Sequence, residues 1–299
     1  MKRTCIFAAY DREGIINCYV ISFLKYLREV ADEIVFVSDC SFSSEELNKI
    51  RNLVSYCYCE HHGEYDFGSY KRGIQYLLKI GNGTIKSDEL ILCNDSCFCI
   101  NTLHNVFKSM SDKKCDFWGM TSSNTPQRHL QSFFLVIRNY MINSECFLNF
   151  INNIKKQKTV FDVIDYYEVP FLSEMENSGF NGDSFILTTE DNPTFFPITL
   201  INQGAPLVKK KIFSERKYCK QSLFELGREI KKNNIESYHD ILNYYGRKSI
   251  FFIWLKLVIY PIFSKVNNFK IYKVDYFSSG TVRYRFLGIP FFFKLKKKK

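Results

Sequence analysis

Residues 88–96 read Asp-Glu-Leu-Ile-Leu-Cys-Asn-Asp-Ser, and this stretch decides the fold that we expect. Its apolar centre, residues 90–93, has the length of a buried strand and ends in a polar turn that contains Asp95. In open α/β sheets, ligands bind at the carboxyl ends of parallel strands. An acid at that point can hold a divalent metal or a sugar hydroxyl. The alternative is that the Asn-Asp pair forms only a turn.

Strand-like and helix-like patterns alternate along the first 120 residues. Apolar and β-branched runs predict further strands at residues 5–9, 33–38 and 53–59. Helical spacing of apolar residues predicts helices at residues 15–30 and 68–80. Ser43, followed three residues later by Glu46, has the capping-box pattern that starts another helix. This β-α-β-α order predicts an α/β fold, with a Rossmann-like, mostly parallel sheet flanked by helices.

The pattern changes after residue 116. Residues 129–137 alternate in a way that predicts one more strand. Further helices are predicted at residues 144–154, 166–178 and 221–245. Gly179 follows the second of these helices and is a typical C-terminal cap.

The composition indicates a folded chain with reduced thiols. Hydrophobic residues make up 46% and aromatic residues 17% of the 299 positions, which argues against global disorder. The eleven cysteines lie inside apolar runs and we find no secretory signal, so we expect free thiols in a reducing cytoplasm. A zinc site is the alternative, but no Cys-x-x-Cys pair supports it.

Charge is distributed unevenly between the two parts of the chain. Residues 1–205 hold 19 Lys and Arg against 25 Asp and Glu, a net charge of −6, whereas residues 206–299 hold 22 against 6, a net charge of +16. The apolar run at residues 249–263 is too short to span a bilayer and has basic flanks, as interfacial helices do. We therefore expect a basic, amphipathic C-terminal extension that contacts an anionic membrane surface. The alternative is a buried helix followed by a solvated tail.

A nucleic-acid partner is disfavoured by the same distribution. The basic residues flank an apolar run, and the larger part of the chain is acidic, which is unlike a groove that follows phosphates. We therefore expect no nucleic-acid binding.

Polar side chains follow the predicted strands and should meet at one edge of a parallel sheet. Together they fit a nucleotide-diphosphate site, with a glycine for close approach and a lysine for phosphate. The candidate donor-binding residues are Tyr10, Asp11, Ser38, Asp39, Asp66, Gly68, Lys71, Asn94, Asp95 and Ser96. Two alternatives stay open, because Lys71 fits a solvated helix position and Asp66 fits a helix cap.

Four motifs resemble, in order and spacing, the rhamnan synthesis protein F family. They lie at residues 64–73, 90–96, 116–121 and 129–134, and the resemblance extends over about residues 4–215. It implies an A-type glycosyltransferase fold, with a nucleotide-sugar half at residues 1–115 and an acceptor half at residues 116–215. Residues 216–299 would then form a helical, basic region at the membrane surface.

The resemblance also implies an inverting transfer of a sugar and a role in it for individual residues. Glu168 would be the catalytic base at a helix start, where the helix dipole favours a carboxylate, and Asp116 is the second candidate. Asp95 stands where such folds place a Mg²⁺ or Mn²⁺ ligand, or it binds the donor sugar directly. The implied donor is dTDP-L-rhamnose, and the implied acceptor is a polyprenol-linked glycan. The expected location is the cytoplasmic side, peripheral on the inner face of the cell membrane.

Three further residues are candidates for acceptor binding. His129 and Gln131 are two positions apart on one predicted strand, so both could face the cleft. Trp118 could stack on a sugar. For each of the three, a place in the core is the competing interpretation.

Two other functions stay open at this point. One is a non-catalytic scaffold of polysaccharide assembly with the same fold, because only one of the residues 94–96 is an acid. The other is a transferase for a different donor sugar. Hydrolysis of the donor separates the scaffold from an enzyme.

Overall fold

The computed structural model describes residues 1–188, 190–247, 272–276, 281–286 and 289–294. The chain divides into a first unit, Met1–Tyr244, and a second unit, Tyr245–Lys299. The candidate site residues all lie in the first unit.

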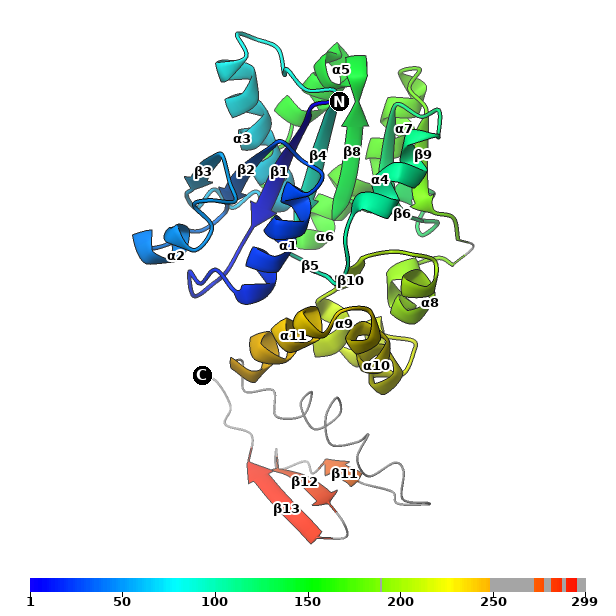
Figure 1. Ribbon diagram of the computed structural model, residues 1–299. Coiled ribbons are helices and arrows are strands. Elements are labelled where there is room, and N and C mark those ends of the chain that lie inside the picture. The colour runs from blue at the N-terminus through cyan, green and yellow to red at the C-terminus, as the bar shows by residue number, and fades with distance from the viewer. Residues whose placement is uncertain (189, 248–271, 277–280, 287–288, 295–299) are drawn as a thin grey trace. The chain divides into compact units, whose positions relative to one another are not determined.

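The first unit is built on a mixed sheet with the order β3-β2-β1-β4-β8-β6-β7, and β9 pairs with β6 (Figure 1). Its strands are β1 (Arg3–Ala9), β2 (Glu33–Ser38), β3 (Tyr56–Cys59), β4 (Glu89–Asn94), β6 (Phe117–Ser123), β7 (His129–Leu130), β8 (Phe134–Arg138) and β9 (Gly182–Ile186). The four strands β3, β2, β1 and β4 are parallel, whereas β8 is antiparallel to both β4 and β6. This arrangement confirms the predicted Rossmann-like fold class.

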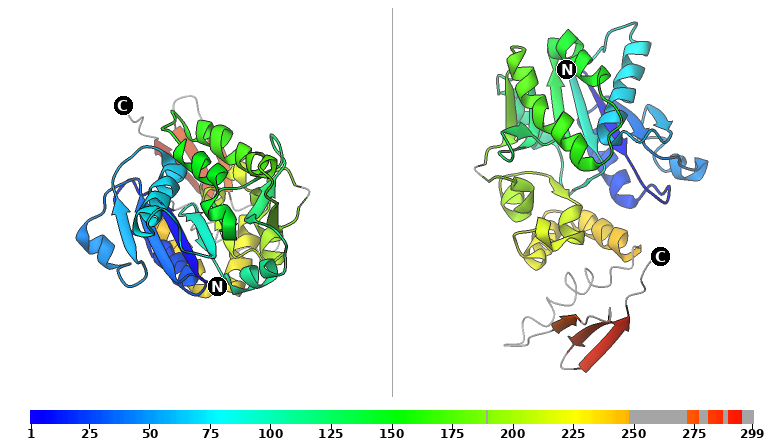
Figure 2. Two further views of the ribbon diagram at one scale, coloured as in Figure 1. Left: turned by 90° about the horizontal axis from the view of Figure 1, so that it is seen from above. Right: turned by 180° about the vertical axis from the view of Figure 1, so that it is seen from behind.

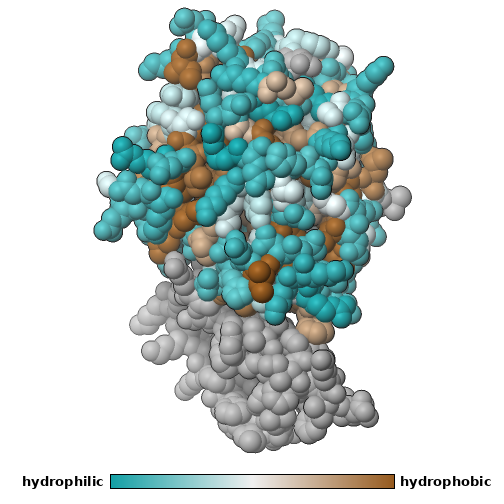
Figure 3. All heavy atoms as spheres, viewed as in Figure 1, coloured by the Kyte–Doolittle hydropathy of each residue, from teal (hydrophilic) through white to brown (hydrophobic). Residues whose placement is uncertain are grey.

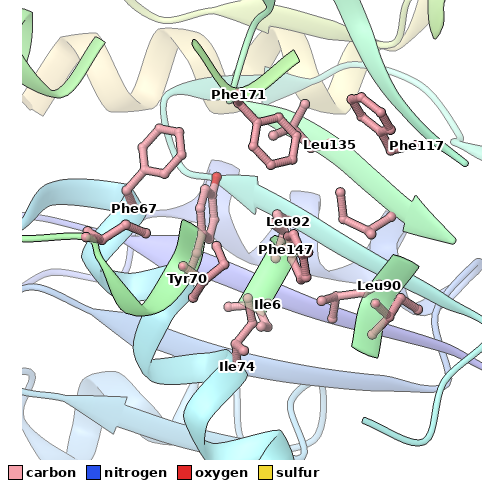
Figure 4. Packing of buried hydrophobic residues seen from close by; sticks show 14 of the residues in the cluster. Ile6, Phe67, Tyr70, Ile74, Leu90, Leu92, Phe117, Leu135, Phe147 and Phe171 are labelled. Atoms are coloured by element: carbon pink, nitrogen blue, oxygen red, sulfur yellow. The ribbon is translucent and has the colours of Figure 1, made fainter. Parts of the chain in front are cut away.

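Helices cover both faces of the sheet (Figures 1 and 2). One face is packed by α3 (Tyr65–Ile80), α5 (Glu145–Asn152) and α7 (Val169–Asn177), and some of the buried side chains of this layer are drawn in Figure 4. On the other face, Phe23 of α1 (Cys18–Arg28) meets Phe7, and Phe107 of α4 (His104–Ser111) meets Trp118. Figure 3 shows hydrophobic side chains scattered among hydrophilic ones on the described surface.

The remaining elements of the first unit are short or lie after the sheet. They are α2 (Ser44–Asn48), β5 (Cys97–Cys99), α6 (Val160–Val163), α8 (Pro197–Asn202), β10 (Leu207–Lys209), α9 (Lys211–Ser214), α10 (Leu223–Asn233) and α11 (Ile235–Arg247). A π-helical turn, η2 (Ile164–Glu168), joins α6 to α7, and three 3-10 turns, η1 (Asn139–Asn143), η3 (Pro193–Phe195) and η4 (Arg216–Tyr218), complete the set. β10 pairs with β5 in a separate two-stranded ladder.

Gly73 allows α3 to approach β1 closely. A Cβ atom at this position would lie 2.5 Å from Cγ2 of Ile6, a side chain that is itself fully buried. We expect Gly73→Ala to lower the free energy of unfolding by roughly 1–3 kcal/mol, because the tightly packed core cannot absorb the added atom without strain. Urea denaturation measures the change. The exposed neighbour Gln75, replaced by alanine, is the control and should stay within about 0.5 kcal/mol.

Two predicted elements differ from those observed. The strand expected at residues 129–137 is interrupted, since β7 ends at Leu130 and β8 begins at Phe134. The helix expected at residues 166–178 begins earlier, at a capping box formed by Thr159 and Asp162. The strand is interrupted where the backbone amide of Ser132 donates to the carboxylate of Glu168 instead of to a neighbouring strand.

α11 ends at Arg247 in the second unit, and the later described residues of this unit form a three-stranded antiparallel sheet. Its strands are β11 (Tyr272–Tyr276), β12 (Thr281–Phe286) and β13 (Ile289–Lys294). We predicted a helical region here, but the alternation of aromatic or β-branched residues with charged ones in β12 is typical of strands. The predicted interfacial segment, residues 249–263, lies outside the described residues. In the described part of the chain, no helix has the length and apolarity needed to cross a membrane.

Candidate functional site

Parallel pairing brings the ends of three strands to one edge of the sheet. Ala9 of β1 is in register with Ser38 of β2, and Ala8 is in register with Asn94 of β4. The residues that follow these strands therefore gather at the same edge, as predicted for a ligand site in an open α/β sheet.

Asp95 is held by a tyrosine and a lysine. The hydroxyl of Tyr19 on α1 donates a hydrogen bond to Oδ2 of Asp95 at 3.1 Å, and Nζ of Lys210 lies 3.3 Å from the same oxygen. Lys210 Nζ also donates to the Tyr19 hydroxyl at 2.5 Å. Burial and the neighbouring charge of Asp95 raise the pKa of Tyr19 well above its usual value, so this hydroxyl keeps its proton.

The ladder between β5 and β10 delivers two lysines to this edge. Lys209 is in register with Cys97, and the backbone amide of Lys210 donates to the carbonyl of Ser96 at 2.8 Å. Nζ of Lys209 donates to Oγ of Ser96 at 2.9 Å. These lysines were not among the predicted site residues. The available signal was three consecutive lysines directly after the apolar run of residues 207–208.

Asn94 connects Asp66 to the turn after β4. Its Nδ2 donates to Oδ2 of Asp66 at 2.6 Å, while its Oδ1 accepts from the backbone amide and hydroxyl of Ser96. Burial and the negative charge of Glu168 raise the pKa of Asp66 to about 6, although Lys209 and Asn94 oppose the shift. Asp66, Asn94, Asp95 and Ser96 thus form one connected group.

The raised pKa of Asp66 makes stability depend on pH. Between its ordinary value of 3.8 and about 6, the folded protein holds a proton that the unfolded chain has lost. The free energy of unfolding should therefore fall as the pH rises through this window. Asp66→Asn should remove that fall, which we expect to be roughly 1–3 kcal/mol. Urea denaturation of both proteins between pH 4 and 7 tests this; a constant difference between them would contradict it.

Glu168 lies at the end of the π-helical turn η2, beside the same group. Its Oε2 accepts hydrogen bonds from the backbone amide of Ser132 at 2.7 Å and from the Ser132 hydroxyl, and its Oε1 lies 3.9 Å from Nε2 of His129. The next residue, Phe133, accepts from the backbone amide of Asn94 at 3.3 Å. The chain is helical before Glu168, so our argument from a helix start is wrong; hydrogen bonds from Ser132 hold this carboxylate instead.

Of the three predicted acceptor residues, His129 lies beside this carboxylate, and Gln131 contacts Thr121 and Asn192. His129 and Gln131 are both buried, and Oε1 of Gln131 accepts from the Thr121 hydroxyl at 2.8 Å. Trp118 is fully buried between Phe107 and Phe134 and faces the core. The core-packing interpretation therefore describes Trp118, because its ring is screened from any ligand.

Two other candidates lie away from the group. Lys71 donates to the backbone carbonyl of Ile154 at 2.7 Å and lines a separate hollow beside β3. Asp116 directly precedes β6. The first residue of β6 pairs with Ile137 of β8, and Ile137 pairs with Leu90 at the start of β4. Asp116 therefore lies at the opposite edge of the sheet from Asp95, which follows the end of β4. There it accepts hydrogen bonds from the Tyr140 hydroxyl and the Asn181 amide, which organise a turn.

The remaining candidates shape the loops around the site. Oδ1 of Asp11 accepts from the amide of Glu13, and Oδ1 of Asp39 accepts from the amides of His62 and Gly63. The hydroxyl of Ser38 accepts from the amide of Cys40, and Gly68 is buried on α3, where a Cβ atom would meet Glu64. Tyr10, Asp11, Tyr19 and Asp95 line a small hollow at the end of β1, with room for little more than one water molecule.

The donor set around Asp95 fits a divalent metal poorly. Oδ2 of Asp95 already receives hydrogen bonds from Tyr19 and Lys210, and a metal at this oxygen would meet the ammonium group. Over the residues that the structure describes, no group of three or more His, Cys, Asp and Glu side chains has the arrangement of a metal site. The alternative from the sequence, a direct hydrogen bond from the donor sugar to Asp95, stays a prediction.

A family model for rhamnan synthesis protein F matches residues 34–249. The chain belongs to the rhamnan synthesis protein F family. This membership confirms the resemblance seen in the motifs and supports a glycosyltransferase-type role. The family match begins at β2 and extends through the paired strands β5 and β10, so it includes most of the gathered group.

Individual relatives are more distant. The virulence protein VirA of Vibrio anguillarum is 29% identical over 149 residues, which is 50% of this chain and 47% of that protein. The match thus spans about half the length of this curated relative. Among solved structures, TarS of S. aureus in complex with UDP is 12% identical, with a TM-score of 0.34 over 98% of this chain and 99% of that one. A structure described as a nucleotide-diphospho-sugar transferase, from Desulfovibrio desulfuricans G20, is 14% identical, with a TM-score of 0.40 over 78% and 99%.

Proposed function

We propose that this family member is an inverting glycosyltransferase that moves a sugar from a nucleotide donor to a growing cell-surface polysaccharide. The observation that carries the proposal is the gathering of Asp66, Asp95 and Glu168 at the carboxyl edge of the parallel strands. The surface at the end of β1 beside Tyr10 and Asp11 is the proposed place of the nucleotide. The family description names rhamnan, which favours L-rhamnose as the transferred sugar, and we propose dTDP-L-rhamnose as its donor.

In the proposed mechanism, Glu168 is the catalytic base. Its Oε1 removes the proton from an acceptor hydroxyl while the hydroxyl oxygen forms a bond to the anomeric carbon of the donor. The bond from that carbon to the diphosphate oxygen breaks at the same time, so the configuration is inverted. Ser132 holds Oε2 of Glu168 through two hydrogen bonds and thereby directs Oε1 toward the acceptor. His129, 3.9 Å from Oε1, is the proposed acceptor-side neighbour.

We further propose that the acceptor is a polyprenol-linked glycan and that the protein acts while bound to an anionic membrane surface. The net charge of +16 on residues 206–299 supports attraction to anionic lipids on the inner face of the cell membrane. Vesicle flotation of the whole chain at rising salt tests this part. Binding that needs anionic lipid and weakens with salt is expected, whereas equal binding to neutral vesicles would contradict it.

Donor binding and donor hydrolysis test the proposed function. Thermal melting with dTDP-, UDP- and GDP-sugars, with and without Mg²⁺, should show a higher melting temperature for one nucleotide class. That donor should also be hydrolysed slowly without an acceptor. If no nucleotide sugar changes the melting temperature or is hydrolysed, the proposal fails. If one binds but is never hydrolysed or transferred, the chain is a non-catalytic scaffold of the same fold.

A further inference from the structure

Three consecutive lysines, residues 209–211, stand at the carboxyl edge of the sheet, and nothing in the proposed mechanism uses them. The backbone fixes the first two, because Lys209 pairs with Cys97 and the Lys210 amide bonds to Ser96. This ladder attaches the lysines to the turn that contains Asp95. The ladder therefore fixes the backbone of Lys209 and Lys210 next to the turn.

The ammonium group of Lys209 can donate a further hydrogen bond to an anion. Its Nζ donates to the Ser96 hydroxyl and lies 4.5 Å from the centre of the Phe133 ring. Over the described residues, no carboxylate lies within ion-pair distance of this ammonium group. A hydroxyl and an aromatic face orient the ammonium group, and its charge acts on the Asp66 carboxyl without a direct ion pair.

Lys210 supplies a cation at Asp95 itself. It lies 3.3 Å from Oδ2 of Asp95 and contacts the rings of Tyr19 and Tyr244. If a metal ion bound here, Asp95 would hold it and the ion would supply positive charge to the phosphates. Here the ammonium group already occupies that side of the carboxylate, and an ammonium group can also donate to a phosphate oxygen.

The three like charges favour an anionic ligand between them. Lys211 is half-buried, and burial together with the charge of Lys209 lowers the pKa of Lys211. Asp95 pairs directly with Lys210, whereas the charges of Asp66 and Glu168 act on Lys209 and Lys211 without a direct ion pair among the described residues. The Lys209 ammonium group can therefore still donate to a ligand at the edge where the donor is proposed to bind. A diphosphate, which carries two or more negative charges, would relieve this repulsion.

We propose that Lys209 and Lys210 bind the diphosphate of the nucleotide donor and take the place of a bridging metal ion. The inference rests on the proposed function and adds the group that stabilises the leaving diphosphate. Its chemical class of ligand is a nucleoside diphosphate, and its physical basis is charge-assisted hydrogen bonding from two ammonium groups.

The test is calorimetric titration of the full chain with UDP, GDP and dTDP and with the corresponding monophosphates. Each titration is done in EDTA and again in Mg²⁺. The wild-type chain should bind one diphosphate in EDTA, prefer it to the monophosphate, and lose affinity as NaCl rises. Lys209→Met and Lys210→Met should each weaken diphosphate binding at least tenfold and reduce the preference over the monophosphate, whereas Lys209→Arg should retain most of it.

The matched control is Lys113→Met. Lys113 is also partly buried and ion-paired, but with Asp183, and it should leave the affinity unchanged. Diphosphate binding that disappears in EDTA and returns with Mg²⁺ would overturn the inference, and so would unchanged affinity in both methionine variants. If these variants do not fold, the EDTA and NaCl titrations of the wild type still show whether diphosphate binding needs a metal ion. If no diphosphate binds under either condition, the proposed function itself has failed, which is a different result.

Discussion

Replacing Glu168 by Gln is expected to lower turnover about 10²–10⁴-fold while leaving the affinity for the nucleotide donor nearly unchanged. Glutamine keeps the size of the side chain, and its amide oxygen can still accept from the Ser132 amide and hydroxyl. What it loses is the ability to take a proton from the acceptor hydroxyl. Steady-state kinetics with the donor identified by melting measures turnover, and calorimetry measures donor affinity.

Glu176→Gln is the control for this substitution. Glu176 lies on α7, the helix that follows Glu168, and pairs with Arg128 on the surface. Its replacement removes the same charge from the same part of the chain and should leave turnover within about twofold. Turnover near the wild-type value in Glu168→Gln would exclude Glu168 as the base. A parallel loss of donor affinity would assign it to binding instead.

Replacing Glu89 by Ala is expected to lower the free energy of unfolding by about 3–5 kcal/mol. Glu89 is buried at the start of β4, where its two oxygens pair with Nε of Arg3 at 2.5 Å and Nε of Arg138 at 2.8 Å. The guanidinium of Arg138 is itself buried and donates to the backbone carbonyl of Met110. Removal of the carboxylate would leave two cations without compensation at the edge opposite the site.

Urea denaturation with a surface control measures this effect. Glu33 pairs with Lys2 in an exposed ion pair, so Glu33→Ala should cost less than about 1 kcal/mol. A loss in Glu89→Ala no larger than in this control would show that the buried network adds little to stability. Because Glu89 is far along the strand from Asp95, the folded fraction of the variant should retain its donor affinity.

The parts of the fold set by local patterns could be predicted from the sequence. Residues 88–96 form β4 and its turn, and the paired strands around it follow from buried apolar runs. Ser43 caps α2, accepting from the Glu46 amide as expected. Only half of the capping box forms, however, because the Glu46 carboxylate accepts from the distant Ile16 amide.

The parts set by contacts between distant segments could not be predicted. Lys209 and Lys210 reach Ser96 and Asp95 across more than a hundred residues, through a ladder of three-residue strands that has no clear periodicity. Glu168 was selected for a helix start, but Ser132, 36 residues earlier, holds its carboxylate. Lys71 has the spacing of a phosphate ligand, yet the rotation of α3 directs it to Ile154.

A crystal structure of the chain with bound UDP, GDP or dTDP, whichever binds in calorimetry, tests the central claim most directly. The account predicts the nucleoside on the surface beside Tyr10 and Asp11 at the end of β1, with phosphate oxygens within hydrogen-bonding distance of Lys209 or Lys210. A nucleotide bound elsewhere, for example in the hollow lined by Lys71 and Tyr76 beside β3, would contradict it.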